Sequence, residues 1–414
     1  MPSAERGLDL AVEIIPGPGK AVEVDLSYNP SLFCGREKQL VQATTIFNRW
    51  YSTGEDSRSI TFTGPRGIGK TWLAEKLGRK IKEETGIPVW RLDLTSHAGT
   101  TVNGQVFQLM GDLIRQVDLG NSIEGLTIPE ASQKLIDSIQ DKRGGKALLI
   151  VDGLSDADRA LIQAMEENFL EELADDKKIF IILTGGQSDY QLYSCVSPSL
   201  RLHATFIDLA AFSPEETVEQ CRLLGQEPPE WLPDAAQGNP ALTAIALNSR
   251  SPKEAAQHGL AYLLEPVPRE LRQEAMNLVF ALCVLDGFNE GKMPVMLSNY
   301  FNQPEWLLKA NINNINIMSI IDFLLKDCRL IYVDTGNMDF VFSGALRPVA
   351  EQYLKSVDPD KWAGLHKAAI DLYSSWYNRL KVKKHNQDYE KRIMLICLNK
   401  IAYHRGQLEI TGYI

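Results

Sequence analysis

Two groups of residues in this sequence have the types and spacing needed to bind phosphate and a divalent cation. One is a glycine-rich loop, residues 64–71, that reads Gly-x-x-x-x-Gly-Lys-Thr. The other is the apolar run 147–151 together with Asp152, which follows it directly. Glycines let backbone N–H groups turn toward an anion, and a hydroxyl with a carboxylate offers the oxygen ligands that Mg²⁺ prefers. The pattern therefore predicts a site for a purine nucleoside triphosphate with Mg²⁺.

The residues of this site have separate expected roles. We expect Lys70 to contact the β- and γ-phosphates, and Thr71 and Asp152 to hold the metal. Thr184 ends a later apolar run, where it either contacts the γ-phosphate or the attacking water, or only terminates a strand. The predicted nucleotide-binding loop comprises Gly64, Pro65, Arg66, Gly67, Ile68, Gly69, Lys70, Thr71 and the following Trp72.

The segments around the loop predict an α/β fold. The β-branched run 59–63 precedes the loop and the helical pattern 70–85 follows it, which is the order that a phosphate loop requires. Further apolar runs alternate with helical patterns, as expected for a parallel sheet with helices on both faces. The expected strands are 87–94, 147–151, 179–183 and 204–209, and the expected helices are 37–52, 105–118, 130–141 and 156–173.

Beyond Phe212 the pattern is mainly helical. Ser213 and Pro214 suit the N-cap and first turn of a helix. Helices followed by strands at 330–333 and 340–342 are typical of a winged-helix module. The predicted organisation is a tail (1–30), a P-loop NTPase sheet domain (31–212), a helical lid (213–262), a winged-helix domain (263–355) and C-terminal helices (356–414).

Composition narrows the class of protein. The chain has 414 residues, of which 44% are hydrophobic, and a net charge of -10. Its six cysteines are scattered without a CxxC pair, which is typical of a reducing compartment and gives no zinc site. With no signal peptide and no membrane-spanning run, we expect a cytoplasmic soluble protein. No histidine pattern suggests a metal besides Mg²⁺.

The acidic charge also bears on nucleic acids. Between residues 265 and 355, where the winged helix is expected, acidic residues outnumber basic ones. Phosphate backbones require clustered Lys and Arg. We therefore expect this module to cover the nucleotide site, and we do not expect nucleic acid to be a partner.

Four segments together resemble the STAND signal-transduction ATPases. Residues 32–37 (LFCGRE) resemble that family's hydrophobic-Gly-Arg-Glu box, and 67–74 (GIGKTWLA) its form of the phosphate loop. Residues 152–156 (DGLSD) are similar to its acidic strand end, and 238–242 (GNPAL) to its Gly-x-Pro box. The resemblance covers roughly residues 31–370, with the boxes in the expected order.

The resemblance implies further site residues. Phe33, Gly35 and Arg36 would cup the adenine, and Pro240 would face the base. Ser343 stands where the family carries a histidine that contacts the β-phosphate of ADP. Ser155 stands where many members carry the carboxylate that activates water, although Asp156 follows it. Thr184 is not followed by the arginine that some members use as a sensor. These departures predict slow hydrolysis with intact nucleotide binding.

Three hypotheses follow. In the first, the chain is an ATP/ADP switch that self-associates or signals to a protein partner in the ATP state. In the second, it is an origin-recognition-type AAA+ ATPase that binds DNA, although Gly153 follows Asp152 where that group has a glutamate. In the third, it is a non-hydrolysing scaffold. Since STAND proteins usually add an effector and a helical-repeat sensor, we expect these on separate proteins or on a longer chain.

Overall fold

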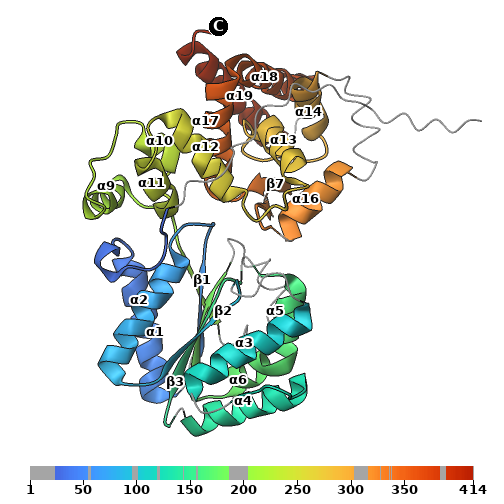
Figure 1. Cartoon of the computed structure of the whole chain (residues 1–414). Helices are drawn as coiled ribbons and strands as arrows, with labels where there is room; N and C mark the ends of the chain where they lie inside the picture. Colours follow the sequence, from blue (N-terminus) through green and yellow to red (C-terminus); the bar gives the residue numbers. More distant parts are fainter. Residues whose placement is uncertain are drawn as a thin grey trace, which may run out of the picture.

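A five-stranded parallel sheet lies at the centre of the amino-terminal half of the molecule (Figure 1). The computed structural model describes residues 24–54, 57–95, 101–118, 122–142, 144–154, 157–185, 204–302, 316–326, 328–334, 336, 338–382 and 388–413. The strand order is β2-β3-β4-β1-β5. The strands are β1 (Ser59–Thr63), β2 (Val89–Asp93), β3 (Ala147–Asp152), β4 (Ile179–Thr184) and β5 (Ala204–Asp208). The predicted α/β class is confirmed.

This strand order brings the predicted chemistry together. β4 lies between β1, which leads into the phosphate loop, and β3, which carries Asp152. Because all pairs are parallel, the carboxyl ends of the three strands share one edge of the sheet. Thr184 at the end of β4 therefore lies between the loop and Asp152.

Helices cover both faces of the sheet, and the side-chain alternation of β3 decides which face Asp152 belongs to. Leu148 and Ile150 pack with α1 (Glu37–Thr53) and α2 (Lys70–Thr85). Leu149 and Val151 pack against the opposite layer. Asp152 therefore projects to the face of α2, since alternate strand residues share a face. The opposite layer consists of α3 (Val102–Val117), α4 (Ile128–Lys142), α5 (Arg159–Met165), a π-helical turn (Glu166–Leu170) and α6 (Glu171–Asp175).

A helical part follows β5 and lies above the carboxyl edge of the sheet in Figure 1. Its first helix begins as predicted, because the Ser213 hydroxyl accepts from the Glu216 N–H and the Glu216 carboxylate accepts from the Ser213 N–H. The helices are α9 (Pro214–Leu223), α10 (Leu232–Ala236), α11 (Pro240–Leu247), α12 (Pro252–Leu263), α13 (Arg272–Leu282), α14 (Met293–Phe301), α16 (Asn316–Lys326) and α17 (Leu346–Val357).

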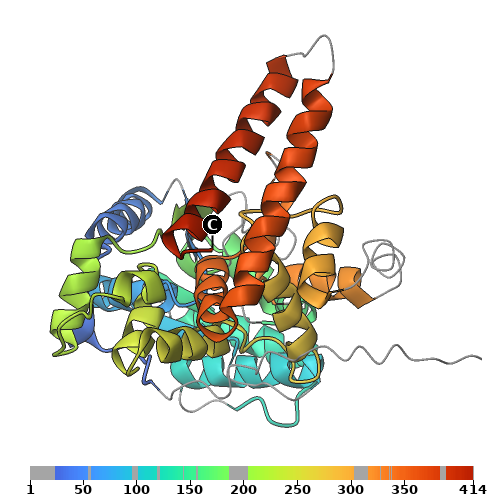
Figure 2. The ribbon, with the colours of Figure 1, turned by 90° about the horizontal axis from the view of Figure 1, so that it is seen from above.

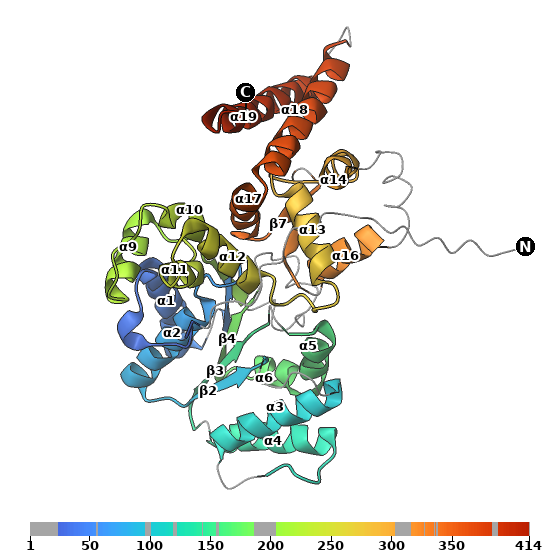
Figure 3. The same cartoon turned by 45° about the horizontal axis from the view of Figure 1, so that its top comes forward.

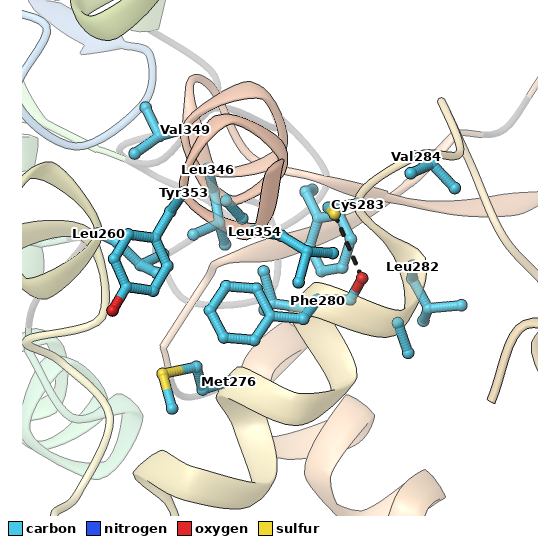
Figure 4. Close-up of a cluster of buried hydrophobic side chains, with 14 of the residues drawn as sticks. Leu260, Met276, Phe280, Leu282, Cys283, Val284, Leu346, Val349, Tyr353 and Leu354 are labelled. Atoms are coloured by element: carbon cyan, nitrogen blue, oxygen red, sulfur yellow. Dashed lines mark hydrogen bonds between the residues drawn. The ribbon is translucent and has the colours of Figure 1, made fainter. Parts of the chain in front are cut away.

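One apolar core joins these helices, and Figure 4 shows the part of it between α12, α13 and α17. Phe280 of α13 stacks on Tyr353 of α17 with ring centroids 5.8 Å apart, and the Cys283 thiol donates to the Phe280 carbonyl at 3.2 Å. The expected hairpin is present as an antiparallel pair of β6 (Ile331–Asp334) and β7 (Asp339–Phe342). It follows α16 and precedes α17, so helices and hairpin occur in the predicted order.

The last two helices form an antiparallel hairpin that extends away from the rest of the molecule (Figures 2 and 3). They are α18 (Pro359–Lys381) and α19 (Asp388–Ile410). At their base, His366 and His404 are fully buried with their Nδ1 atoms 2.9 Å apart, and His366 Nε2 lies 3.3 Å from Glu351. Across the described residues, no helix has both the length and the apolar character to cross a membrane.

Candidate nucleotide site

A cavity of about 1020 Å³ lies between the carboxyl edge of the sheet and the helical part. The predicted site residues that line it are Phe33, Arg36, Arg66, Gly67, Ile68, Gly69, Lys70, Thr71, Trp72, Asp152, Thr184 and Pro240. Gly35, Gly64, Pro65 and Ser343 are not among the lining residues. Asp156 and Ser155 lie outside the described residues. The predicted loop, acid and lid thus converge on one cavity that has ample room for a nucleotide.

The phosphate loop leads directly into α2, which begins at Lys70. A helix that starts at such a loop directs its N–H groups and positive end toward an anion. The Lys70 ammonium donates to the carbonyls of Gly64 and Pro65, both at 2.9 Å, so it lies over the loop. Gly67 has a φ of +79°, and a Cβ there would lie 2.8 Å from Ala241. The lid therefore packs so closely that only glycine fits at this position.

Asp152 is held by two threonine hydroxyls. Thr71 donates to its Oδ1 at 2.9 Å, and Thr184 donates to the same oxygen at 2.6 Å. The Gly153 N–H in turn donates to the Thr184 hydroxyl at 3.0 Å. Thr184 therefore both ends its strand and contacts the predicted metal carboxylate.

These residues fit Mg²⁺. The Thr71 hydroxyl and the Asp152 carboxylate are adjacent hard oxygen ligands, the type that Mg²⁺ takes together with water and substrate phosphates. Within the described residues, no group of three or more His, Cys, Asp and Glu side chains could hold a metal alone. A bound Mg²⁺ would thus depend on Thr71, Asp152 and the nucleotide, and it would neutralise developing phosphate charge.

An arginine that the motifs did not predict binds Asp152 as well. Arg91 Nη2 lies 2.8 Å from Asp152 Oδ2, and Arg91 Nη1 lies 2.7 Å from Glu75 Oε1 on α2. The signal in the sequence was a positive charge in the middle of the strand Val89–Asp93, which also ends in an acid. A charge in a strand of a sheet with both faces covered usually has a partner, so the position could have been singled out.

The Gly-Arg-Glu box fastens the loop to the connection between β5 and α9. Arg36 is 5% exposed and has a φ of +72°. Its guanidinium donates to the carbonyls of Ile68 at 2.9 Å and Ala210 at 2.7 Å, and it lies 4.5 Å from the Phe212 ring centroid. A Cβ on Gly35 would lie 3.0 Å from Phe212 and Glu216. Arg36 and Phe33 line the cavity, whereas Gly35 packs closely against Phe212 and Glu216.

Cys34 also lines the cavity, but its thiol is too weakly acidic to act as a nucleophile. Burial, together with the nearby carboxylates of Glu219, Glu37 and Glu216, raises the pKa of its thiol to about 12. The thiol therefore stays protonated at neutral pH, and only the thiolate is nucleophilic.

Helix α11 starts directly on the phosphate loop. The Asn239 side chain caps α11 through its carbonyl, which accepts from Ala241 and Leu242, and its amide donates to the Arg66 carbonyl at 2.8 Å. The Ala241 N–H donates to the Gly67 carbonyl at 3.2 Å. Asn239 was missed, although an asparagine before Pro240 is a typical N-cap.

The region around the β6-β7 hairpin contacts the same edge of the sheet. Gly344 has a φ of +55°, and a Cβ there would lie 2.4 Å from the Cβ of Pro65. The Arg329 guanidinium donates to the Leu154 carbonyl, just after Asp152. Ser343, the predicted phosphate contact, is 9% exposed, and its N–H donates to the Leu330 carbonyl at 2.8 Å. The described contact with the loop is therefore made by Gly344, next to the predicted residue.

Comparison with known families identifies the sheet domain. Residues 53–192 match the family model described as an AAA domain. Over this segment, about a third of the chain, the sequence is similar to an AAA domain. The matched family is not a STAND or NACHT family, so the predicted subclass is not supported. A search of curated protein sequences found no match.

Solved structures also resemble this chain at low sequence identity. The Aeropyrum pernix ORC2 protein in its ADP form shares 16% identity over 83% of this chain and 97% of that chain, with a TM-score of 0.47. The Cdc6p of Pyrobaculum aerophilum shares 14% over 81% and 97%, with a TM-score of 0.42. The Thermotoga maritima RuvB branch migration motor shares 12% over 75% and 93%, with a TM-score of 0.36. Sequence identities and TM-scores this low do not assign a function, because one fold can carry many different functions.

Proposed function

We propose that this chain is a nucleotide-controlled switch of the AAA type, which binds ATP or ADP with Mg²⁺ and hydrolyses ATP slowly. In this proposal the nucleotide binds in the cavity lined by Lys70, Thr71, Asp152 and Thr184. Its phosphates would contact the loop, and its base would lie toward Phe33 and Pro240. Exchange of ADP for ATP would change how the helical part packs on the sheet domain, and the ATP state would favour self-association or a protein partner.

One observation carries this proposal. Residues far apart in the sequence, Asn239 and Gly344, both contact the phosphate loop through the carbonyl of Arg66 and the side chain of Pro65. A ligand bound at this loop would therefore lie next to the residues that make both contacts. A ligand shifts a conformational equilibrium only when it interacts differently with the two states, and a nucleotide between two packed parts does so.

Slow hydrolysis follows from the neighbours of Asp152. Gly153 occupies the next position and has no side chain to orient a water. Phosphoryl transfer needs an oriented nucleophile in addition to electrostatic stabilisation. Thr184 and Asp152 can order the metal side of the reaction, but they are already bonded to each other. We therefore expect turnover that is slow relative to nucleotide exchange.

Small-angle scattering with light-scattering detection tests the switch. The same preparation is measured with ADP and Mg²⁺, with a non-hydrolysable ATP analogue and Mg²⁺, and without nucleotide. We expect the radius of gyration or the mass to differ between the ADP and ATP-analogue states. Identical mass and shape in both states would contradict the switch. Nucleotide binding without any phosphate release would instead favour the scaffold hypothesis.

DNA binding is the second candidate, because the match to an AAA domain fits the origin-recognition-type hypothesis better than the STAND one. The predicted winged-helix segment would then contact duplex DNA. Such binding weakens steeply with salt, because each contacted phosphate releases a counterion. Fluorescence anisotropy with a labelled DNA duplex, measured from about 50 to about 200 mM salt, tests for this binding, since the affinity of such complexes falls steeply over that range. The absence of binding at the lowest salt would exclude this function.

A further inference from the structure

We infer that Arg91 is a built-in cation of the magnesium site, which competes with Mg²⁺ for Asp152 and so sets the metal concentration at which nucleotide binds tightly. The inference rests on the proposed nucleotide binding and adds a regulating residue to that site. It assigns a role to a side chain that none of the sequence motifs includes.

The fold places this guanidinium beside the metal carboxylate. Asp93 is the register partner of Asp152, and Arg91 lies two residues before Asp93 on the same face of β2. From there the Arg91 side chain reaches the carboxyl end of the neighbouring strand β3, where Nη2 lies 2.8 Å from Asp152 Oδ2. The side chain of Asp152 is 8% exposed and that of Arg91 is 39% exposed, so the ion pair is partly buried, mainly at the acid. A partly buried pair is screened less by salt than an exposed one.

The hydrogen bonds of Asp152 show why the two cations compete. Its Oδ1 accepts from Thr71 and Thr184, and its Oδ2 accepts from Arg91. The Thr71 hydroxyl and this carboxylate are also the groups that would hold Mg²⁺. A metal ion at this place meets a carboxylate that is already neutralised, and it lies close to a fixed positive charge. Both effects weaken metal binding.

Arg91 has other acids to hold it when the metal binds. Glu75 Oε1 lies 2.7 Å from Nη1, and Asp93 Oδ2 lies 3.9 Å from Nη2. The guanidinium can therefore turn from Asp152 toward Glu75 and Asp93 without leaving every ion pair. Removing Glu75 as a partner should strengthen the hold of Arg91 on Asp152.

This gives a test in which two variants of one ion-pair cluster move in opposite directions. The affinity for a fluorescent ADP analogue is measured against free Mg²⁺ in metal buffers, and the midpoint of the Mg²⁺ dependence is recorded. Arg91→Gln should lower the midpoint by about threefold to tenfold, because the competing charge is gone. Glu75→Gln should raise it by about twofold, because Arg91 then binds Asp152 more firmly. Arg91→Lys keeps the charge and should stay near the wild type.

A purely structural ion pair predicts something else. Both Arg91→Gln and Glu75→Gln break the bridge between β2 and α2, so both would shift the midpoint in the same direction, and that result would overturn the inference. If Arg91→Gln does not fold, an unchanged or lowered midpoint in Glu75→Gln overturns it equally. If the wild type binds the analogue independently of Mg²⁺, the inference fails while nucleotide binding stands. If the wild type binds no nucleotide, the proposed function itself fails.

Discussion

Thr184 shows how a single hydroxyl can connect two parts of the site. It donates to Asp152 at 2.6 Å, accepts from the Gly153 N–H, and is 2% exposed. A valine of the same shape would leave the Gly153 N–H without this acceptor and Asp152 without one donor. Leaving such groups unsatisfied costs about 1–3 kcal/mol.

We therefore expect Thr184→Val to lower the free energy of unfolding by about 1–2 kcal/mol and to reduce the ATP hydrolysis rate at least about tenfold. Nucleotide affinity without Mg²⁺ should stay within about twofold of the wild type, because the loop itself is unchanged. Phosphate release and metal-free binding are measured in parallel. Thr205→Val is the control. It removes a hydroxyl on the edge strand β5 that is hydrogen-bonded to the Ser57 hydroxyl. An unchanged hydrolysis rate in Thr184→Val would refute the role given to this residue.

Among the helices, strands and turns, the turn after β7 packs against the phosphate loop through Gly344, which has no side chain. Gly344→Ala would place a methyl group 2.4 Å from the Pro65 Cβ and would also strain a left-handed backbone. We expect the hairpin region to separate from the loop, with faster nucleotide release and easier proteolysis between the two parts. Gly225→Ala controls for the backbone alone, since its φ is +73° and nothing lies within 4 Å. Equal release rates in both variants would mean that the Pro65 contact has no functional role.

The base of the α18-α19 hairpin should be acid-sensitive. Burial, and secondarily the neighbouring His366, lowers the pKa of His404 to about 3 from its ordinary 6.5. The unfolded chain therefore takes up a proton below pH 6.5 that the folded chain does not. Stability is lost as pH falls from that value toward 3, by at most about 1.4 kcal/mol per pH unit.

His404→Gln removes this proton uptake. At pH 7.5, about a unit above the histidine's ordinary pKa, the variant should be less stable because a packed ring is lost. The difference in unfolding temperature between the variant and the wild type should then narrow as pH approaches about 5, because only the wild type is destabilised by keeping His404 neutral when folded. Thermal unfolding followed by circular dichroism at several pH values measures this. A constant difference across the range would show that His404 does not govern the acid response.

Local patterns predicted the elements better than the contacts between them. The capping residues Ser213 and Glu216 act within four residues, so their pattern is readable in the sequence. The apolar run of β3 and its terminal acid are equally local. Arg91 became a site residue only because β2 pairs with β3, and no local pattern sets that pairing. The contact of Gly344 with Pro65 likewise depends on how parts distant in sequence pack.

At the scale of the whole molecule, the arrangement brings the helical part over the carboxyl edge of the sheet. Asn239 and Arg329 contact the two loops that follow β1 and β3. The predicted order of boxes suggested this closure, but the STAND subclass drawn from the same boxes is not supported by the AAA match. These short motifs reflect how other segments pack over a phosphate loop, and related classes of P-loop protein have that packing in common.

The binding of nucleotide to the phosphate loop is the central claim, and an equilibrium titration with a fluorescent ADP analogue tests it most directly. The comparison is between the wild type, Lys70→Ala, and Lys80→Ala, which removes a surface lysine paired with Glu84 on the same helix. We expect Lys70→Ala to weaken binding at least about tenfold, because it removes the charge that contacts the phosphates, and Lys80→Ala to bind like the wild type. Equal affinities in all three proteins would contradict the account.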